Sequence, residues 1–133
     1  MARQIQLSFL PQQVSSIRGL TFDTHYVPAL KVGGDFYDFV EDVGSGWTIA
    51  VGDATGHGLH AGMVVGVAKS LLRATNGSRA LGATLHRIHD GLATLHDRRA
   101  GMSMVLVGLS GRVLRIASAG MPPLLVRRQG SGE

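Results

Sequence analysis

The sequence has 133 residues, enough for one domain, and 44% of them are hydrophobic, so a buried core can form. It has no cysteine, which excludes disulfides, thiolate metal sites and a cysteine nucleophile, and it has no apolar run of the roughly 18 residues that a membrane span needs. The net charge of +4 favours anionic partners such as phosphoproteins, whereas only 5% aromatic residues argues against a nucleic-acid partner. We therefore expect a cytoplasmic protein.

The first half of the chain predicts a short helix followed by strands. Residues 2–10 carry several apolar side chains and stop at a proline, which ends a helix. Partly alternating apolar residues over 20–27, and β-forming residues over 35–40 and 47–51, predict three strands. The last two form a hairpin, because a Gly-Ser-Gly turn separates them.

A Gly-Asp pair stands at each end of this hairpin, Gly34-Asp35 at the start and Gly52-Asp53 at the finish. The aspartates are 18 positions apart (53 − 35 = 18). An antiparallel hairpin places the start of its first strand beside the end of its second. We therefore expect the two carboxylates to lie close together at the open end of the hairpin.

Two helices and further strands are predicted in the second half. Apolar residues recur every three or four positions over 59–74 and 80–95, which predicts two helices that each bury one face. A hairpin over 102–109 and 112–117 and a short strand over 124–127 follow. Strands before and after two helices indicate an α+β fold. Side chains expected in the core include Trp47, Met63, Met102 and Met104. The acidic residues expected to face solvent are Asp38, Glu41 and Asp42.

Asp35 and Asp53 suit a hard divalent cation. Carboxylate oxygens are the ligands that Mg²⁺ and Mn²⁺ prefer, and a backbone carbonyl of the turn over 52–56 can add another oxygen. Such a metal generates a nucleophile from water and offsets charge on a phosphoryl group, while N–H groups at the next helix start attract anions. The alternative is that each Gly-Asp pair is a simple turn, in which Asp accepts backbone hydrogen bonds.

The histidines leave two interpretations open. His57 either donates a proton to a leaving group or merely caps the following helix or faces solvent. The other helical histidines, His60, His86, His89 and His96, are interpreted as polar helix-face residues, because the pair three apart lacks a third metal ligand. A Mg²⁺-nucleotide site is disfavoured, since the glycine-rich turn has no Gly-Lys-Ser/Thr ending.

The segments around the two aspartates resemble a known enzyme family. Residues 28–39 read PALKVGGDFYDF and residues 51–58 read VGDATGHG. This pattern is similar to the PPM-type metal-dependent serine/threonine phosphatases, in particular their bacterial stage-II-sporulation-E and RsbU branch. Ile5-Gln6 with Leu10-Pro11 resembles the linker before that domain, and residues 119–125, AGMPPLL, resemble the family's A-G-H-P-P segment. The resemblance covers nearly the whole chain.

This resemblance implies an α-β-β-α sandwich with metals at one end of the paired sheets. It implies that Asp35, Asp53 and the Ala54 carbonyl bind Mn²⁺ or Mg²⁺, with Asp53 bridging two ions in the complete domain. The residues expected at the substrate are Gly56, His57 and Gly58. The implied activity is hydrolysis of phosphoserine or phosphothreonine by a metal-activated water, on a phosphoprotein such as a phosphorylated anti-sigma factor antagonist.

The sequence departs from the family pattern in two ways. It lacks the Thr-Asp-Gly motif and the later aspartate that hold the other metal, so we expect residues 1–18 to be a linker helix and loop and residues 19–133 to be the N-terminal two-thirds of the domain, a truncated sandwich. Met121 replaces the usual His, and Ala54 the common Gly. These departures favour a second hypothesis, a catalytically inactive interaction module in sigma-factor regulation. The apolar N-terminal segment also predicts a helix-mediated homodimer.

Overall fold

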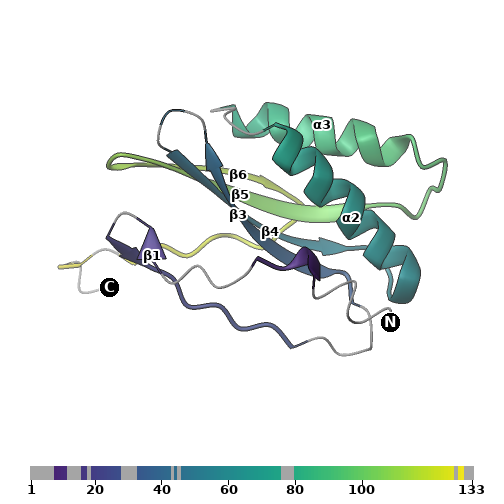
Figure 1. The fold of residues 1–133 in the computed structure, drawn as a ribbon, viewed down its shortest axis with the longest axis horizontal. Helices are drawn as coiled ribbons and strands as arrows, with labels where there is room; N and C mark the ends of the chain where they lie inside the picture. The colour runs from purple at the N-terminus through teal and green to yellow at the C-terminus, as the bar shows by residue number, and fades with distance from the viewer. Residues whose placement is uncertain are drawn as a thin grey trace.

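The fold is an antiparallel sheet with two helices packed on one face (Figure 1). The structure is a computed structural model, and it describes residues 8–11, 16–17, 19–27, 33–42, 44, 46–75, 80–127 and 129–130. Its elements in chain order are β1 (Ser16–Ile17), β2 (Leu20–Thr21), β3 (Asp35–Asp42), β4 (Gly46–Ala54), α2 (Gly58–Ala74), α3 (Leu81–Ala93), β5 (Met102–Ser110) and β6 (Val113–Ala119).

The main sheet has the order β3-β4-β5-β6, and every neighbouring pair is antiparallel. Both predicted hairpins and the α+β class are confirmed. The second strand is longer than predicted, because β4 continues to Ala54 instead of ending before the second Gly-Asp pair. β4 pairs with β3 on one side and with β5 on the other, so backbone hydrogen bonds on both edges keep it extended through Asp53.

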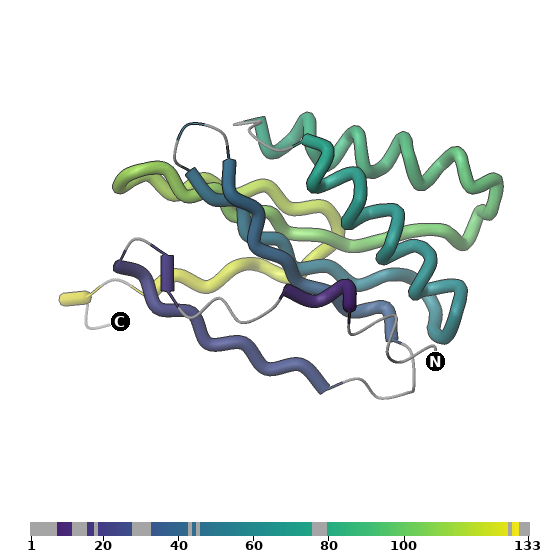
Figure 2. Tube along the Cα trace, viewed as in Figure 1, coloured from purple at the N-terminus to yellow at the C-terminus, as the bar shows by residue number. Residues whose placement is uncertain are grey.

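The three elements predicted outside the main sheet and its helices differ from the observed structure. The strand predicted over 124–127 is wrong, since residues 121–127 form no regular secondary structure. The strand predicted over 20–27 shortens to β2, and residues 22–27 form no regular secondary structure. This segment contacts β3 through side chains of Phe22, Thr24 and Tyr26. The Phe22 ring meets Phe39 edge-on, with centroids 5.1 Å apart. Of the predicted N-terminal helix, residues 8 and 9 are helical, and residues 1–7 lie outside the described part. Figure 2 shows the segment over 22–27 running beneath the sheet.

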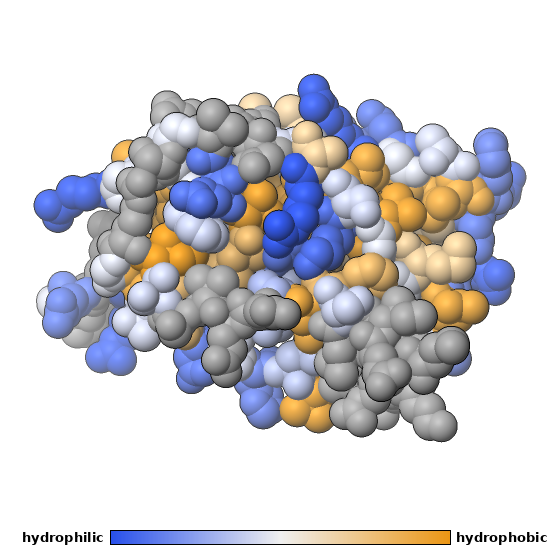
Figure 3. Space-filling view, in the orientation of Figure 1, coloured by the Kyte–Doolittle hydropathy of each residue, from blue (hydrophilic) through white to orange (hydrophobic). Residues whose placement is uncertain are grey.

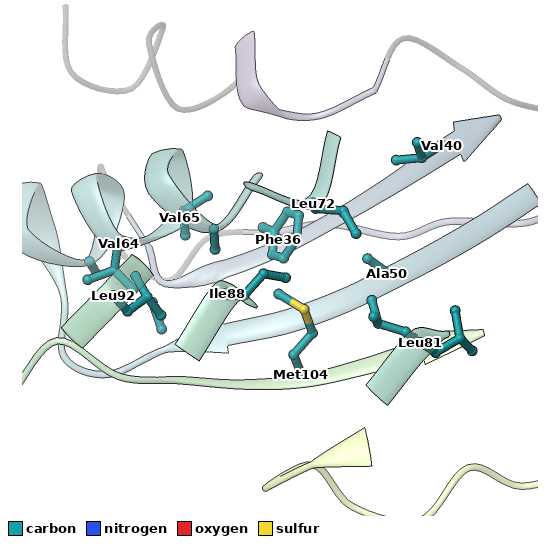
Figure 4. Packing of buried hydrophobic residues seen from close by; sticks show 14 residues of the cluster. Phe36, Val40, Ala50, Val64, Val65, Leu72, Leu81, Ile88, Leu92 and Met104 are labelled. Carbon is teal, nitrogen blue, oxygen red and sulfur yellow. The ribbon is translucent and has the colours of Figure 1, made fainter. Parts of the chain in front are cut away.

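The core lies between the sheet and the helices (Figure 4). Alternate residues of the strands point toward the helices, so Phe36 and Met104 are only 2% exposed. The helices contribute residues at three-four spacing: Val64, Val65, Ala68, Leu72, Leu81, Ile88 and Leu92. The prediction for Met104 is confirmed, whereas Met102 and Trp47 are half-buried. The prediction that Met63 lies in the core is wrong. Its side chain is 58% exposed, because it lies on the solvent side of α2.

The other face of the sheet carries apolar side chains that are partly exposed. Val51, Leu114 and Ile116 alternate with helix-facing residues and are between 42% and 50% exposed. Figure 3 shows one side of the molecule, where hydrophobic residues lie between polar ones. Within the part of the chain that the structure describes, no helix is both long and apolar enough to span a bilayer.

Asp38 is the clearest departure from the sequence prediction, because it is fully buried rather than solvated. The two-residue period of β3 places it between Phe36 and Val40 on the helix-facing side. There its carboxylate accepts hydrogen bonds from Arg73 Nε at 2.9 Å and Nη2 at 2.8 Å, and it pairs with Lys69 Nζ at 3.2 Å. The hydrogen bond to Asp38 raises the pKa of the Arg73 guanidinium above its usual value.

We expect Asp38→Ala to lower the free energy of unfolding by about 3 kcal/mol, because it leaves a mostly buried Lys69 ammonium without its carboxylate. Urea denaturation measures this change. Asp90→Ala is the matched control, since Asp90 is exposed on α3, and its effect should stay within about 0.5 kcal/mol. Equal effects of the two substitutions would contradict a stabilising role for the buried ion pairs.

Candidate metal centre

Asp35 and Asp53 lie directly opposite each other across the β3–β4 pair. Directly opposed residues of an antiparallel pair have Cα atoms about 4.5–5.5 Å apart and share one face of the sheet. Both aspartates are exposed, while their neighbours Phe36 and Gly52 are buried on the helix side. The expected proximity of the two carboxylates is confirmed, and it lies on the face turned away from the helices.

The two carboxylates repel each other. The pKa of Asp35 is raised above the usual carboxyl value, first by partial burial and second by the negative charge of Asp53. Among the described residues, no lysine, arginine or histidine side chain forms an ion pair with either aspartate. A divalent cation between the two oxygen groups would relieve this repulsion, and carboxylates are the ligands that Mg²⁺ and Mn²⁺ prefer.

A close backbone contact fixes the register beside the two aspartates. The Ala54 N–H donates to the Gly34 carbonyl at 2.9 Å. A Cβ atom at Gly34 would lie 3.1 Å from the Ala54 nitrogen and from Asp53 Oδ1, and closer still to the Ala54 carbonyl oxygen. Only glycine permits this approach, so the Gly of the first Gly-Asp pair has a steric role rather than a turn role.

The turn between β4 and α2 carries the three residues expected at the substrate. Gly56 and Gly58 have positive φ values of 86° and 72°, which glycine adopts without strain. His57 lies between them at the N-cap position of α2, is exposed, and makes no side-chain cap hydrogen bond. The capping interpretation of His57 is therefore not supported, whereas its exposure agrees with the solvent-facing interpretation. An exposed imidazole is also accessible to a bound molecule.

The donor set fits only part of a metal centre. Asp35 and Asp53 offer two carboxylates. Ala54 directly follows Asp53, so its backbone carbonyl is a candidate third oxygen ligand. In the described ranges of the chain, no group of three or more His, Cys, Asp or Glu side chains could hold a metal ion. The described residues thus suit a hard cation with water completing its shell, and the assignment of Asp35, Asp53 and Ala54 as ligands stays a prediction.

Sequence reasoning missed the loop between α3 and β5, which lies beside the candidate centre. The Thr55 N–H donates to the Gly101 carbonyl at 2.9 Å, which joins this loop to the turn after β4. His60 Nδ1 lies 3.4 Å from Asp97 Oδ2, so α2 is also tied to the loop. His96 was expected on a helix face, but it follows the end of α3 and has φ 51°. No sequence signal relates residues 55 and 101, since only the β4–β5 register brings them together.

Asp97 organises this loop. Its carboxylate accepts the Arg99 backbone N–H at 2.9 Å and lies 3.5 Å from Arg99 Nε. The backbone hydrogen bond from Arg99 is the main reason why the pKa of Asp97 falls below its usual value, with the Arg99 and His60 charges as smaller contributions. The side chain most exposed to solvent in this group is that of Arg99, at 83%.

Comparison with known proteins identifies the family. The family model described as Stage II sporulation protein E (SpoIIE) matches residues 44–133, more than half of the chain. The chain belongs to the SpoIIE family. This is a family of PPM-type phosphatase domains, so the resemblance inferred from the two Gly-Asp pairs is confirmed. Phosphatases of this type are generally metal-dependent.

The chain is also similar to a solved structure and, over part of its length, to the sequence of a second protein. The SiaA-PP2C domain of Pseudomonas aeruginosa superimposes with a TM-score of 0.72 at 28% sequence identity, over 89% of this chain and 50% of that one. Protein IcfG of Synechocystis sp. (strain ATCC 27184 / PCC 6803 / Kazusa) is 35% identical over 85 residues, which are 64% of this chain and 13% of IcfG. The chain thus has the PP2C-type fold and spans half or less of the length of these relatives.

Gly34→Ala should lower the free energy of unfolding by about 2 kcal/mol, because the new methyl group overlaps the Ala54 backbone and pushes the strand ends apart. Gly82→Ala on α3 is the matched control. Nothing lies within 4 Å of a Cβ there, so a helical alanine should instead stabilise by about 0.5–1 kcal/mol. Chemical denaturation of both variants distinguishes the two signs; a stabilised Gly34→Ala variant would show that the contact is not tight.

Mn²⁺ should raise the melting temperature of the chain, since a cation that binds only the folded state adds about 2.7 kcal/mol at 100 times its Kd. Asp53→Asn should abolish this shift. Without metal, the same variant should melt at the same or a higher temperature, because the repulsion with Asp35 is removed. Differential scanning calorimetry with and without Mn²⁺ measures both effects, with Asp90→Asn as the control that keeps the shift. A shift that survives in Asp53→Asn would remove Asp53 from the ligand set.

Proposed function

We propose that the chain carries part of the catalytic site of a protein phosphatase that hydrolyses phosphoserine or phosphothreonine on a regulatory protein. The observation that supports this most is the direct opposition of Asp35 and Asp53 at one end of the β3–β4 pair, in a member of a phosphatase family. Neither carboxylate has an ion-pair partner among the described residues. Residues 19–133 would be the phosphatase part and residues 1–18 the linker before it.

In this proposal Asp35, Asp53 and the Ala54 carbonyl hold Mn²⁺ or Mg²⁺. When bound, such a cation offsets the negative charge of the phosphoryl group and makes water a nucleophile near neutral pH. Gly34 keeps the two carboxylates in register by its contact with Ala54. Both aspartates are exposed, so a phosphorylated side chain could approach them from solvent.

His57 and the start of α2 act on the substrate rather than on the metal. The first N–H groups of α2 have no partner within the helix and favour a phosphoryl oxygen. Hydrolysis breaks the bond between phosphorus and the serine or threonine oxygen, and that oxygen must gain a proton. His57, exposed at the N-cap of α2, is the proposed donor of this proton.

The substrate would be a phosphoprotein, such as a phosphorylated anti-sigma factor antagonist. This rests on the resemblance to the bacterial branch of the family. The net charge of +4 supports an anionic partner, because opposite charge speeds association.

The alternative function is an interaction module without catalysis. It is favoured by the absence, among the described residues, of any group of three or more His, Cys, Asp or Glu side chains that could hold a metal ion. Such a module would bind a sigma-regulatory partner and release no phosphate at any metal concentration.

Phosphate release from a phosphoserine peptide tests the proposal, with this chain and with the longest protein that its gene encodes. We expect Mn²⁺-dependent turnover in at least one of them, and a loss of at least about a hundredfold in Asp53→Asn, because charge stabilisation at the phosphoryl group contributes several kcal/mol. Asp90→Asn should retain turnover. Unchanged turnover in Asp53→Asn would exclude the proposed site, and partner binding without turnover in any protein would favour the interaction module.

A further inference from the structure

The turn over 55–57, between β4 and α2, is not held in place by its own sequence. Gly56 and Gly58 flank His57 and have positive φ values, and glycine restricts the backbone less than any other residue. His57 makes no side-chain cap hydrogen bond to α2. The position of its imidazole therefore depends on contacts that other parts of the chain make with the turn.

The ring of His60 lies between this turn and the loop that joins α3 to β5. His60 belongs to the first turn of α2, three residues after His57. A Cβ atom at Gly56 would lie 4.0 Å from His60 Cδ2, so one edge of the ring faces the turn. At the other edge, His60 Nδ1 lies 3.4 Å from Asp97 Oδ2 in the loop. Figure 1 shows the start of α2 and this loop at the same end of the main sheet.

Asp97 is the one polar partner of this ring within the described ranges. The Nε2 atom of His60 is buried and has no hydrogen-bond partner there. A carboxylate beside Nδ1 favours the tautomer that carries its proton on Nδ1, since that N–H then faces a negative charge. The contact with Asp97 therefore determines how the imidazole is oriented.

The backbone of the loop holds Asp97. Its carboxylate accepts the Arg99 N–H at 2.9 Å, and its carbonyl accepts the Ala100 N–H at 2.9 Å. Both hydrogen bonds join residues two or three positions apart, so they define a tight turn that begins at Asp97. Asp97 therefore presents its carboxylate to His60 from a hydrogen-bonded part of the loop.

A second contact joins the other end of the turn to the same loop. The Thr55 N–H donates to the Gly101 carbonyl at 2.9 Å. A Cβ atom at Gly101 would lie only 3.0 Å from Thr55 Oγ1, so the loop and the turn pack closely there. Thr55 precedes His57 and His60 follows it, so the loop contacts the chain on both sides of His57.

We propose that Asp97, acting through His60, is a positioning residue for His57. The two contacts described above hold both ends of the turn against one loop, and His57 lies between them. The inference rests on the proposed function, in which His57 protonates the serine or threonine oxygen as its bond to phosphorus breaks. It deepens that function by naming the residues that keep His57 at the place where the proton is needed.

Amide hydrogen exchange in this chain tests the contact without any catalysis. Asparagine at position 60 places its side-chain N–H groups near the position of Nδ1, so His60→Asn can still donate to Asp97. Glutamine places them near the position of Nε2, so His60→Gln loses this contact. The Thr55 amide should exchange about tenfold faster in His60→Gln, the effect of losing one polar contact to a charged group, and within about threefold of the parent rate in His60→Asn.

Arg99→Ala is the matched control in the loop. It removes a side chain near Asp97 but keeps the backbone N–H that Asp97 accepts, so Thr55 exchange should stay within about threefold of the parent rate. The Leu106 amide, in the middle of β5, should exchange at the parent rate in all three variants, which shows that the sheet is intact. Glutamine has a higher helix propensity than asparagine, so faster exchange in His60→Gln cannot come from a weaker α2.

Turnover of two substrates separates positioning from a general loss of folded protein. The serine oxygen of a phosphoserine peptide leaves poorly unless it gains a proton, whereas p-nitrophenolate leaves without one. In the longest protein that the gene encodes, Asp97→Ala and His60→Gln should each lower the Mn²⁺-dependent kcat about tenfold on the peptide and less than about threefold on p-nitrophenyl phosphate. The double variant should lose no more than Asp97→Ala alone, because both changes remove the same contact.

Equal Thr55 exchange in His60→Asn and His60→Gln would overturn the role of the Nδ1 contact. Equal losses of kcat on the two substrates would overturn the positioning of His57. The proposed function fails separately. If no protein releases phosphate while Thr55 exchange still rises in His60→Gln, the phosphatase activity is excluded and the contact between the turn and the loop stands.

Discussion

The antiparallel pairing of β3 with β4 is the constraint on which the candidate centre depends. It places Asp35 opposite Asp53, and the two-residue period of the strands puts both carboxylates on the face away from the helices. A shift of the register by one residue would move one carboxylate into the core side of the sheet. The contact of Gly34 with the Ala54 backbone resists such a shift, and β5 holds β4 from its other edge.

The same strand that begins with Asp35 also anchors the helix layer. Asp38 faces α2 and binds Arg73 and Lys69 there, so β3 carries one acidic residue outward to the candidate centre and another inward to the core. Lys69 also donates to the Phe9 carbonyl, and the Phe9 ring lies beside Gly66. The charged cluster thus joins β3, α2 and the segment over 8–11.

In this member of the SpoIIE family, two acidic residues lie together at one end of the β3–β4 pair. The PP2C-type fold of the SiaA domain matches 89% of this chain, and the chain spans half of that domain's length. The aspartate pair, the glycine-rich turn and the loop over 95–101 all meet at one end of the β4–β5 pair. These three parts of the chain therefore lie together at one end of the main sheet.

The sequence by itself determined the elements that local pattern encodes. Alternation and turn residues predicted both hairpins, the three-four spacing predicted α2 and α3, and the eighteen-residue separation predicted the proximity of Asp35 and Asp53, because hairpin geometry is local. The Gly-Asp motifs also indicated the phosphatase family. The local pattern gave the wrong solvent exposure for two side chains. Asp38 was expected to face solvent but is buried, and Met63 was expected in the core but is exposed.

Only the tertiary structure decided the contacts between residues that are far apart in the chain. The charged partners of Asp38, Arg73 and Lys69, lie far from it in the sequence, and Thr55 meets Gly101 only because β5 pairs with β4. His60 likewise reaches Asp97 only because the loop after α3 lies beside the start of α2. No spacing in the sequence encodes these contacts, since they depend on how the helices pack across the sheet. The physical reason is that side-chain periodicity specifies which face of an element is buried, whereas packing between elements specifies what that face meets.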